Sequence, residues 1–313
     1  MNRYVIRKFL LLIPTAFVVV TVVFWTMHLA PGDPAVAILG DDADSETLEA
    51  FRARYDLNRS LMVQYASYLR GLAKGDLGVS YENNRSVLSS YFEMLPYTID
   101  LIVVATVFSV LIGIPLGTIS ALRYNSLVDY TTTIFSSMLI AFPIFFLGIL
   151  LLLVFAAHLN IFPVLGGGDL SHLGSRVRHL ILPALSLGLV EGARVLRVTR
   201  TSMLNVLSEA YITTARAKGL SSRRINYVHA LRNALIPITT LVGIHITVLL
   251  AGSILTETVF NRPGIGRLLV GAIHARDYPM VQSGLLIYAI LVVLVNLLVD
   301  LAVGFIDPRV RYE

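Results

Sequence analysis

Basic side chains are concentrated in one stretch of this sequence, from Arg194 to Arg232, between two long apolar segments. Clustered Lys and Arg side chains bind partners electrostatically, and they also hold loops on the cytoplasmic side of membranes. The sequence contains no Gly-x-x-x-x-Gly-Lys-Ser/Thr segment, no His-Glu-x-x-His and no cysteine, and its histidines lack ligand spacing. We therefore expect binding chemistry at the basic stretch, and no catalytic, cofactor or metal site in this chain.

The residues around Gly219 predict a helix, a tight corner and a second helix. Ser208 can accept hydrogen bonds from the first amides of a helix that begins at Glu209. Gly219 can end that helix because glycine tolerates the left-handed conformation, and Leu220 suits the apolar contact that follows such an end. Either of the two serines after Leu220 can cap the second helix. A short helix on a rigid corner is a surface that a partner protein can push against.

Two segments of the basic stretch carry a resemblance to a known family. Residues 215–220 are Ala-Arg-Ala-Lys-Gly-Leu, and residues 229–234 are His-Ala-Leu-Arg-Asn-Ala. Together they resemble the cytoplasmic loop of the permease subunits of bacterial ABC importers, in the dipeptide/oligopeptide/nickel branch. The general motif is Glu-Ala-Ala-x-x-x-Gly followed, nine residues on, by Ile-x-Leu-Pro. Aligned on Gly219, this chain has Thr-Thr-Ala where Glu-Ala-Ala would stand and Leu231-Arg232 where Leu-Pro would stand, departures that resemble the peptide branch.

The resemblance implies that this loop contains a coupling helix, which docks into a groove on a separate ATPase subunit. The implied docking residues are Glu209, Thr213, Thr214, Ala215, Arg216, Ala217, Lys218, Gly219 and Leu220. Glu209 lies about one helical turn too early to take over the role of the family's Glu directly. The residues alone leave a simpler interpretation open, a basic loop that only sets membrane topology.

Composition places the chain among polytopic membrane proteins. It has 313 residues, of which 56% are hydrophobic and 14% charged, and its mean hydropathy is +0.74. A net charge of +5 and a pI near 9.5 could indicate nucleic-acid binding. In a membrane chain, the bias of cytoplasmic loops towards Lys and Arg explains this charge more simply.

Six apolar stretches are long enough to cross a bilayer as helices, which takes roughly 20 residues each. The predicted spans are 9–30, 97–122, 131–157, 180–199, 236–258 and 281–305, with an external loop at 31–96 and the cytoplasmic coupling loop at 200–235. The first is longer than a signal-peptide core and lacks a clear cleavage site, so we expect it to be retained. Basic side chains before the first span, and Arg309 and Arg311 after the last, place both termini in the cytoplasm. We expect an all-α membrane protein with one domain over 1–313, which the resemblance makes a type I ABC importer permease.

The predicted external loop is rich in acidic residues and has two candidate helices. Ser45 can cap the first, which would run through Tyr55. Apolar residues at helical spacing between Leu61 and Leu72 predict the second. Pro31-Gly-Asp-Pro and Gly75-Asp-Leu-Gly also resemble the peptide branch. The loop could help to receive a solute-binding protein, or it could only pack on the helix ends.

Ionisable and polar side chains within the spans are candidates for a transport pathway, because charge is costly in a bilayer unless it faces protein or water. Glu191 and Arg194 stand three residues apart on one helix face, so an ion pair and a pathway lining are both open. His245, Asn296 and Asp300 could line the pathway or hydrogen-bond a neighbouring helix. Arg197 and Arg200 could extend to the inner headgroups.

A Pro- and Gly-rich segment follows the fifth span and also resembles the peptide branch. Its candidate residues for an external gate or a receptor contact are Glu257, Phe260, Arg262, Gly266, Arg267, Asp277 and Tyr278.

The sequence thus predicts the permease of a binding-protein-dependent ABC importer in the bacterial inner membrane, with peptides as cargo. The resemblance implies a second related permease, two cytoplasmic ATPase subunits that carry ATP and Mg²⁺, and an external solute receptor. The same architecture could carry glutathione or nickel. Two other classes stay open, an ion-gradient-driven transporter, against which the lack of a visible repeat argues, and a scaffold or sensor that transports nothing.

Overall fold

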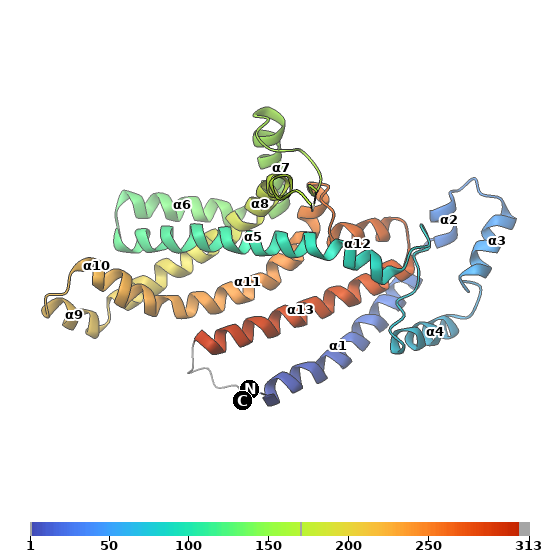
Figure 1. The fold of residues 1–313 in the computed structure, drawn as a ribbon, viewed down its shortest axis with the longest axis horizontal. Coiled ribbons are helices and arrows are strands. Elements are labelled where there is room, and N and C mark those ends of the chain that lie inside the picture. Colours follow the sequence, from blue (N-terminus) through green and yellow to red (C-terminus); the bar gives the residue numbers. More distant parts are fainter. Residues whose placement is uncertain (1, 170, 307–313) are drawn as a thin grey trace. The chain divides into compact units, whose positions relative to one another are not determined.

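The computed structural model describes residues 2–169 and 171–306, with side chains for residues 10–169 and 171–301 (Figure 1). This part of the chain is built from helices, with one isolated antiparallel bridge between Val79 and Ser86. Among the described residues, five helices are long and apolar enough to cross a membrane, or six spans are present if one bent helix pair is counted as a span. The prediction of an all-α membrane protein is confirmed. The predicted position of the C-terminus depends on Arg309 and Arg311, which lie outside the described residues.

Contacts along the chain separate two compact units. Unit 1 comprises Met1–Thr98 and Pro263–Leu294, and unit 2 comprises Ile99–Arg262 and Val295–Glu313. The helices wholly within unit 1 are α1 (Asn2–Leu29), α2 (Pro34–Leu39), α3 (Ser45–Arg54), α4 (Leu61–Ala73) and α12 (Ile265–His274). Two further helices, α5 (Val87–Leu122) and α13 (Tyr278–Ile306), contribute to both units. One domain over 1–313 stays a prediction.

Unit 2 contains the helices on either side of the basic stretch. They are α6 (Leu127–Ala141), α7 (Ile144–Leu151), the π-helical segment η1 (Leu152–His158), α8 (Leu173–Leu207), α9 (Ala210–Ala217), α10 (Ser222–Arg224), the π-helical segment η2 (Ile225–Ala230) and α11 (Leu231–Val259). α8 packs against α6, α7 and α11, and its buried residues are concentrated in its middle, between Leu180 and Thr199. α8 is therefore the central helix of this unit.

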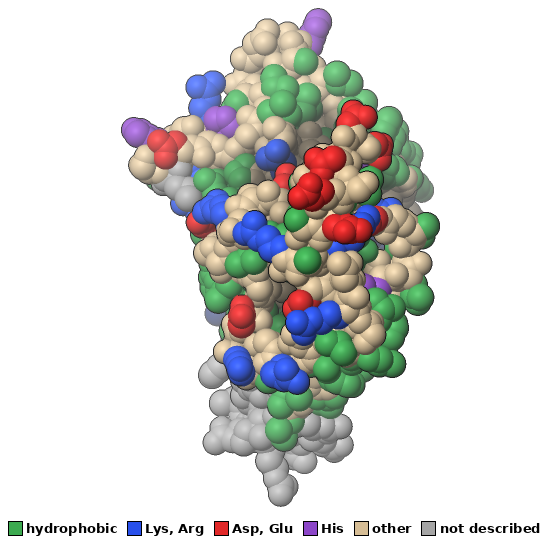
Figure 2. Space-filling view, turned by 90° about the vertical axis from the view of Figure 1, so that its right-hand side faces the viewer, with side chains coloured by type: hydrophobic (Ala, Val, Ile, Leu, Met, Phe, Trp, Pro, Cys, Tyr) green, Lys and Arg blue, Asp and Glu red, His purple; other side chains and the backbone are tan. Residues whose placement is uncertain are grey.

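In unit 1, the segment after α1 folds into the two predicted helices and a third, shorter one. α3 is capped by Asp44 rather than by Ser45, because the Asp44 carboxylate accepts a hydrogen bond of 2.7 Å from the backbone N–H of Thr47. This bond holds the pKa of Asp44 below its ordinary value. Arg52 of α3 binds Asp33 at 2.6 Å, which ties α3 to the start of α2. Figure 2 shows acidic side chains at the surface of the face that carries these helices, where Asp41, Asp42, Asp44, Glu46 and Glu49 are exposed.

The region predicted as one span over 131–157 is sharply bent. α6 ends at Ala141, Phe142 is extended with ψ 134°, and the helices on either side of Pro143 are bent by 104°. Proline lacks an N–H and disfavours a helical conformation in the preceding residue, which explains the break at Phe142. This pair counts as a sixth span only if it is taken as one broken crossing.

Several helices extend beyond the limits that apolar composition predicted, and α5 and α8 do so by the largest number of residues. α5 begins at Val87 rather than at Tyr97, because Val87 and Tyr91 are buried and add an amphipathic start to the apolar helix. α8 extends beyond 180–199 at both ends, since Arg176 and Arg200 each bind a carboxylate of unit 2 and so the helix continues through charged residues.

Within unit 2, α5 and α8 approach each other closely through glycines. A Cβ on Gly113 would lie 2.7 Å from the Gly192 carbonyl oxygen, and one on Gly117 would lie 2.5 Å from the Leu196 carbonyl oxygen. Small residues four apart let two membrane helices touch backbone to backbone. Gly113 and Gly117 therefore let the backbones of α5 and α8 come into contact.

Candidate functional site

The helix expected to dock on a partner is shorter than predicted and begins differently. Ser208 ends α8: its N–H donates to the Leu204 carbonyl at 3.2 Å, and its hydroxyl donates to the Asn205 carbonyl at 2.7 Å. Glu209 takes the N-cap position of α9, which spans Ala210–Ala217. The prediction that Ser208 caps a helix starting at Glu209 is wrong, because the backbone of α8 already engages Ser208.

The end of α9 is the glycine corner that the sequence predicts. Gly219 has φ +75°, in the left-handed region. Its N–H donates to the Arg216 carbonyl at 2.9 Å, and the N–H of Leu220 donates to the Ala215 carbonyl at 3.3 Å. This pair of bonds is a Schellman motif, which satisfies the last carbonyls of a helix. Ser221 then takes the N-cap position of α10, so the chain leaves the corner directly into the next helix.

One apolar face holds α9 on unit 2. Ile212 is fully buried and belongs to a cluster with Ala121 of α5, Met203 of α8 and Ala234 of α11. Ile225 and Ala230 of η2 complete this cluster, and Ala215 and Leu220 pack against it from the corner. We call this set the α9 cluster. Through it, α9 packs on η2 and shares one apolar core with the ends of α5, α8 and α11.

The other face of α9 is exposed and basic. Of the predicted docking residues, the exposed ones are Glu209, Thr213, Thr214, Arg216, Ala217, Lys218 and Gly219, whereas Ala215 and Leu220 are partly buried. Tyr227 and Val228 of η2 are about half exposed and extend the open surface. Ile212 as the anchor, and Tyr227 and Val228 as surface, were not among the predicted docking residues. An isoleucine flanked by polar residues in a short helix is a signal that could have identified the anchor.

Glu191 is fully buried in unit 2, and the side chains of Arg194 and His245 contact its carboxylate. Arg194 donates to Oε1 of Glu191 at 2.5 Å, and His245 of α11 faces Oε2. The predicted ion pair within α8 is therefore present, and His245 joins it from the next helix, which spacing along the sequence does not show. A pathway role for the three residues stays a prediction.

Asn296 of the last span bonds to a neighbouring helix. Thr247 of α11 donates to Oδ1 of Asn296 at 2.6 Å within unit 2, as expected of a polar group that joins neighbouring helices. Asp300 is partly buried. Among the residues that the structure describes, no three His, Asp or Glu side chains gather as a metal site requires.

Most candidates for the external gate or receptor contact are buried. In unit 2, Glu257, Phe260 and Arg262 have little or no exposed surface, and Arg262 lies 3.9 Å from Asp100. In unit 1, Gly266, Asp277 and Tyr278 are buried, whereas Arg267 is exposed. Asp277 accepts a hydrogen bond of 2.5 Å from the Ser80 hydroxyl, which ties the start of α13 to the turn before α5. In this structure the buried candidates pack within the folded segment. Direct contact with a receptor stays a prediction, and Arg267 suits it best because its side chain is exposed.

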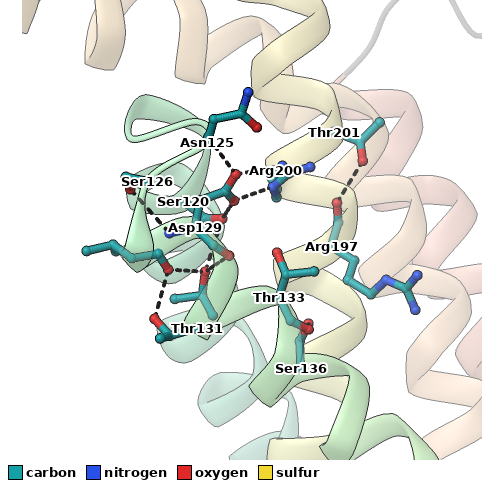
Figure 3. Close-up of polar contacts among 12 residues, drawn as sticks. Ser120, Asn125, Ser126, Asp129, Thr131, Thr133, Ser136, Arg197, Arg200 and Thr201 are labelled. Atoms are coloured by element: carbon teal, nitrogen blue, oxygen red, sulfur yellow. Dashed lines mark hydrogen bonds and ion pairs between the residues drawn. The ribbon is translucent and has the colours of Figure 1, made fainter.

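The two arginines near the end of α8 differ from each other (Figure 3). Arg200 binds Asp129 of α6 at 2.6 Å, so it does not extend to lipid headgroups as predicted. The attraction of the buried Asp129 carboxylate outweighs hydration of the guanidinium there. Arg197 is exposed, and its side chain lies apart from this contact.

Comparison with known proteins identifies the family. Residues 113–312 match the model of the binding-protein-dependent transport system inner membrane component. Residues 1–102 match the model for the N-terminal part of such membrane components. The dipeptide transport system permease proteins DppB of Alkalihalophilus pseudofirmus and Escherichia coli K12 are 39% and 37% identical, with 100% of each chain covered. The glutathione transport system permease protein GsiC of Escherichia coli K12 is 39% identical, also with 100% of each chain covered.

The fold agrees with this match. A chain of the MetNI methionine ABC transporter, solved in inward-facing conformations, aligns with a TM-score of 0.57 at 17% identity, over 70% of this chain and 96% of that chain. At this identity the alignment shows a shared fold. With the family models and the full-length relatives, it establishes that the chain is a multi-pass inner-membrane protein belonging to the family of binding-protein-dependent transport system inner membrane components.

Proposed function

We propose that this chain is a permease subunit of an ATP-driven importer for peptides and that α9 is its coupling helix. The observation that carries the proposal is the geometry of α9, a basic helix with one open face, held at a Schellman corner on the ends of three long helices. A loop that only set topology would need positive charge but no buried anchor or fixed corner. The names of the full-length dipeptide relatives support peptides as cargo.

In this mechanism ATP and Mg²⁺ bind to partner ATPase subunits, and this chain binds no nucleotide. Closure of the ATPases displaces α9, and the α9 cluster passes the displacement to α5, α8 and α11 together. A displacement shifts a conformational equilibrium only if the contacts differ in free energy between the two states. Exposed Arg216 and Lys218 suit this role, because their ion pairs with an acidic groove can form and break without disturbing the buried Ile212.

The proposed orientation places α9 and both termini in the cytoplasm, because the basic stretch is the strongest concentration of positive charge in the chain. The acidic surface of α3 then lies outside, where a solute receptor delivers cargo. A second, related permease would complete the pathway, which we propose is lined near the middle of α8 by the Glu191, Arg194 and His245 group, with Asn296 and Asp300 contributing from α13. Arg194 is partly exposed, and a charged group on a membrane helix avoids lipid by facing protein or water.

The test of coupling uses two substitutions that disturb docking by different routes. Ala217→Asp places a carboxylate on the exposed basic face, and Gly219→Pro is incompatible with φ +75° because proline holds φ near −65°. Asn205→Asp, on the exposed surface of α8, is the control for an added negative charge. We expect both α9 variants to lose co-purifying ATPase subunits or peptide-stimulated ATP hydrolysis, while the control keeps both. If the α9 variants behave as wild type, α9 is not the docking element, and if no ATPase co-purifies with wild type, the importer proposal fails.

A second candidate cargo is glutathione, because a glutathione permease is as similar to this chain as the dipeptide permeases are. Uptake by the complete system in liposomes, measured with a labelled dipeptide, a longer peptide, glutathione and Ni²⁺ in competition, separates the candidates. Saturable uptake of peptides that excess glutathione and Ni²⁺ leave unchanged is the expected result. A transport system that accumulates only glutathione or Ni²⁺ would contradict the peptide proposal.

A further inference from the structure

A buried carboxylate joins three helices next to the α9 cluster. Asp129, in the first turn of α6, accepts hydrogen bonds from Nε and Nη2 of Arg200 at 2.6 and 2.8 Å (Figure 3). It also accepts one from the hydroxyl of Ser120, near the end of α5, at 2.6 Å, and one from the backbone N–H of Asn125 at 3.1 Å. The Asp129 side chain is 3% exposed and that of Arg200 is 25% exposed.

This contact has the features of a permanent link rather than a transient surface pair. A carboxylate can accept about four hydrogen bonds, and Asp129 receives that number. The paired bonds from the guanidinium are the strongest kind of ion pair in proteins, and the start of α6 adds the positive end of a helix dipole. The guanidinium also lies 5.5 Å from the centre of the Tyr124 ring. Opening the link would leave a charge buried without its partner, which is strongly unfavourable.

The link lies one helical turn from the residues that hold α9. On α8, Arg200 is followed by Met203, which is fully buried in the α9 cluster with Ile212. On α5, Ser120 is followed by Ala121, which belongs to the same cluster. The α9 cluster and the Asp129 link therefore form successive layers across the same ends of α5 and α8.

A second ion pair holds α8 to α5 near the start of α8, away from α9. Asp100 of α5 pairs with Arg176 of α8, the Arg176 Nε donating at 2.6 Å, and the Arg176 side chain is 26% exposed. Between the two pairs, Gly113 and Gly117 bring the backbones of α5 and α8 into contact. The chain thus supplies a matched pair of arginines, of which only Arg200 lies beside α9.

We propose that Asp129 and Arg200 are positioning residues that make the ends of α5, α6 and α8 beside α9 move as one rigid body when an ATPase displaces α9. This inference rests on the proposed function, because it requires a partner that acts on α9. The α9 cluster includes residues of α5 and α8 but none of α6. α6 packs along α8, and Asp129 fixes its end beside α9 to both α5 and α8. Without the link, α8 moves while α6 lags behind it, and ATP hydrolysis continues without a matching movement of the helices that line the pathway.

The first test measures peptide uptake per ATP hydrolysed in the complete complex, with receptor, both permeases and ATPases in liposomes. Asp129→Asn keeps the shape and the bond from Ser120 but removes the charge, Arg200→Met removes the guanidinium, and Arg176→Met is the matched control. We expect the first two to keep bound ATPase and ATP hydrolysis while uptake per ATP falls by about 2- to 30-fold, the range of coupling changes seen for single substitutions. Arg200→Lys keeps the positive charge but loses the paired Nε and Nη2 donors, so its peptide uptake per ATP should lie between the values of Arg200→Met and wild type.

The inference is overturned if Asp129→Asn and Arg200→Met take up as much peptide per ATP hydrolysed as wild type does. It is also overturned if Arg176→Met lowers peptide uptake per ATP by the same factor as these two variants. If wild-type chain binds no ATPase, the proposed function fails instead, so the two failures are distinguishable.

A second measurement does not require the variants to assemble. The chain has no cysteine, so Leu127→Cys in α6 and Asn205→Cys in α8 place two spin labels at defined exposed sites of the otherwise wild-type subunit. The rigid body predicts the same label-to-label distance without nucleotide and with ATP, in a complex whose ATPase is active. A distance that changes with ATP shows that α6 and α8 move separately and overturns the inference even if Asp129→Asn fails to fold.

Discussion

Replacing Gly219 by alanine tests the corner of α9 with a single methyl group. Gly219 has φ +75°, and a Cβ added there would meet no atom within 4 Å. The cost is therefore backbone strain without a clash, about 1–2 kcal/mol for an L-residue in the left-handed conformation. In the alanine variant the unbound corner relaxes away from this conformation, and docking must restore it. That free energy lowers the affinity for the ATPase subunit by about 5- to 30-fold.

The assay is a titration of purified ATPase subunit onto the two-permease complex in lipid nanodiscs. Gly219→Asn should lose less affinity than Gly219→Ala, because asparagine tolerates the left-handed region better. Gly174→Ala is the control, since a Cβ there also meets no atom within 4 Å and Gly174 is outside the left-handed region. An unchanged affinity in Gly219→Ala, or the same loss in Gly174→Ala, would refute the argument that a left-handed corner presents α9.

Three further outcomes follow from buried groups. Glu191→Ala leaves the Arg194 guanidinium without its buried anion and should destabilise the purified chain by about 3–5 kcal/mol. The measurement is a lower unfolding temperature, and Glu191→Gln should lose less. Gly117→Leu must separate α5 from α8, because its Cβ would lie 2.5 Å from the Leu196 carbonyl oxygen. We expect it to lower the free energy of unfolding by about 1–3 kcal/mol or more in the same assay. Gly174→Leu, where a Cβ meets no atom within 4 Å, should stay close to wild type. Burial raises the pKa of Tyr68 in α4 to about 12, so its contribution to stability is complete below the unfolded pKa of about 10 and is lost as the pH rises towards 12. Tyr68→Phe should then shift alkaline unfolding, followed by circular dichroism, to higher pH, and an unshifted midpoint would contradict this.

Local features of the sequence were sufficient for the helical class and for the corner at Gly219. Apolar runs long enough to cross a bilayer predict helices because their backbone groups must bond within the segment. The Gly219 corner depends on the φ angle of one residue and on hydrogen bonds between near neighbours, so its chemistry is visible in a few consecutive residues. The pairing of Glu191 with Arg194 could be predicted for the same reason, because three residues separate them on one helix.

Tertiary contacts decided the helix limits and the buried charge pairs. Ser208 has the composition of an N-cap, yet α8 extends to it, because burial along α8 outweighs the local preference of one serine. The ends of α8 were predicted too short, since Arg176 and Arg200 appear unfavourable in a membrane helix until their carboxylates are placed beside them. Ser126-Leu-Val-Asp129 has the spacing of a capping box, which marks the start of α6 but not the partner of Asp129.

The sequence by itself determined the class of the protein, the apolar helices and the α9 corner, because each depends on residues close together in the chain. The structure decided which charges meet: Asp129 with Arg200, Asp100 with Arg176, and His245 with Glu191. These pairs join different helices, and their partners are set by how the helices pack, which in α5 and α8 depends on glycines that allow the backbones to touch. A charge in a membrane helix is stable only beside its partner, so the packing of unit 2 settles where each of these residues acts.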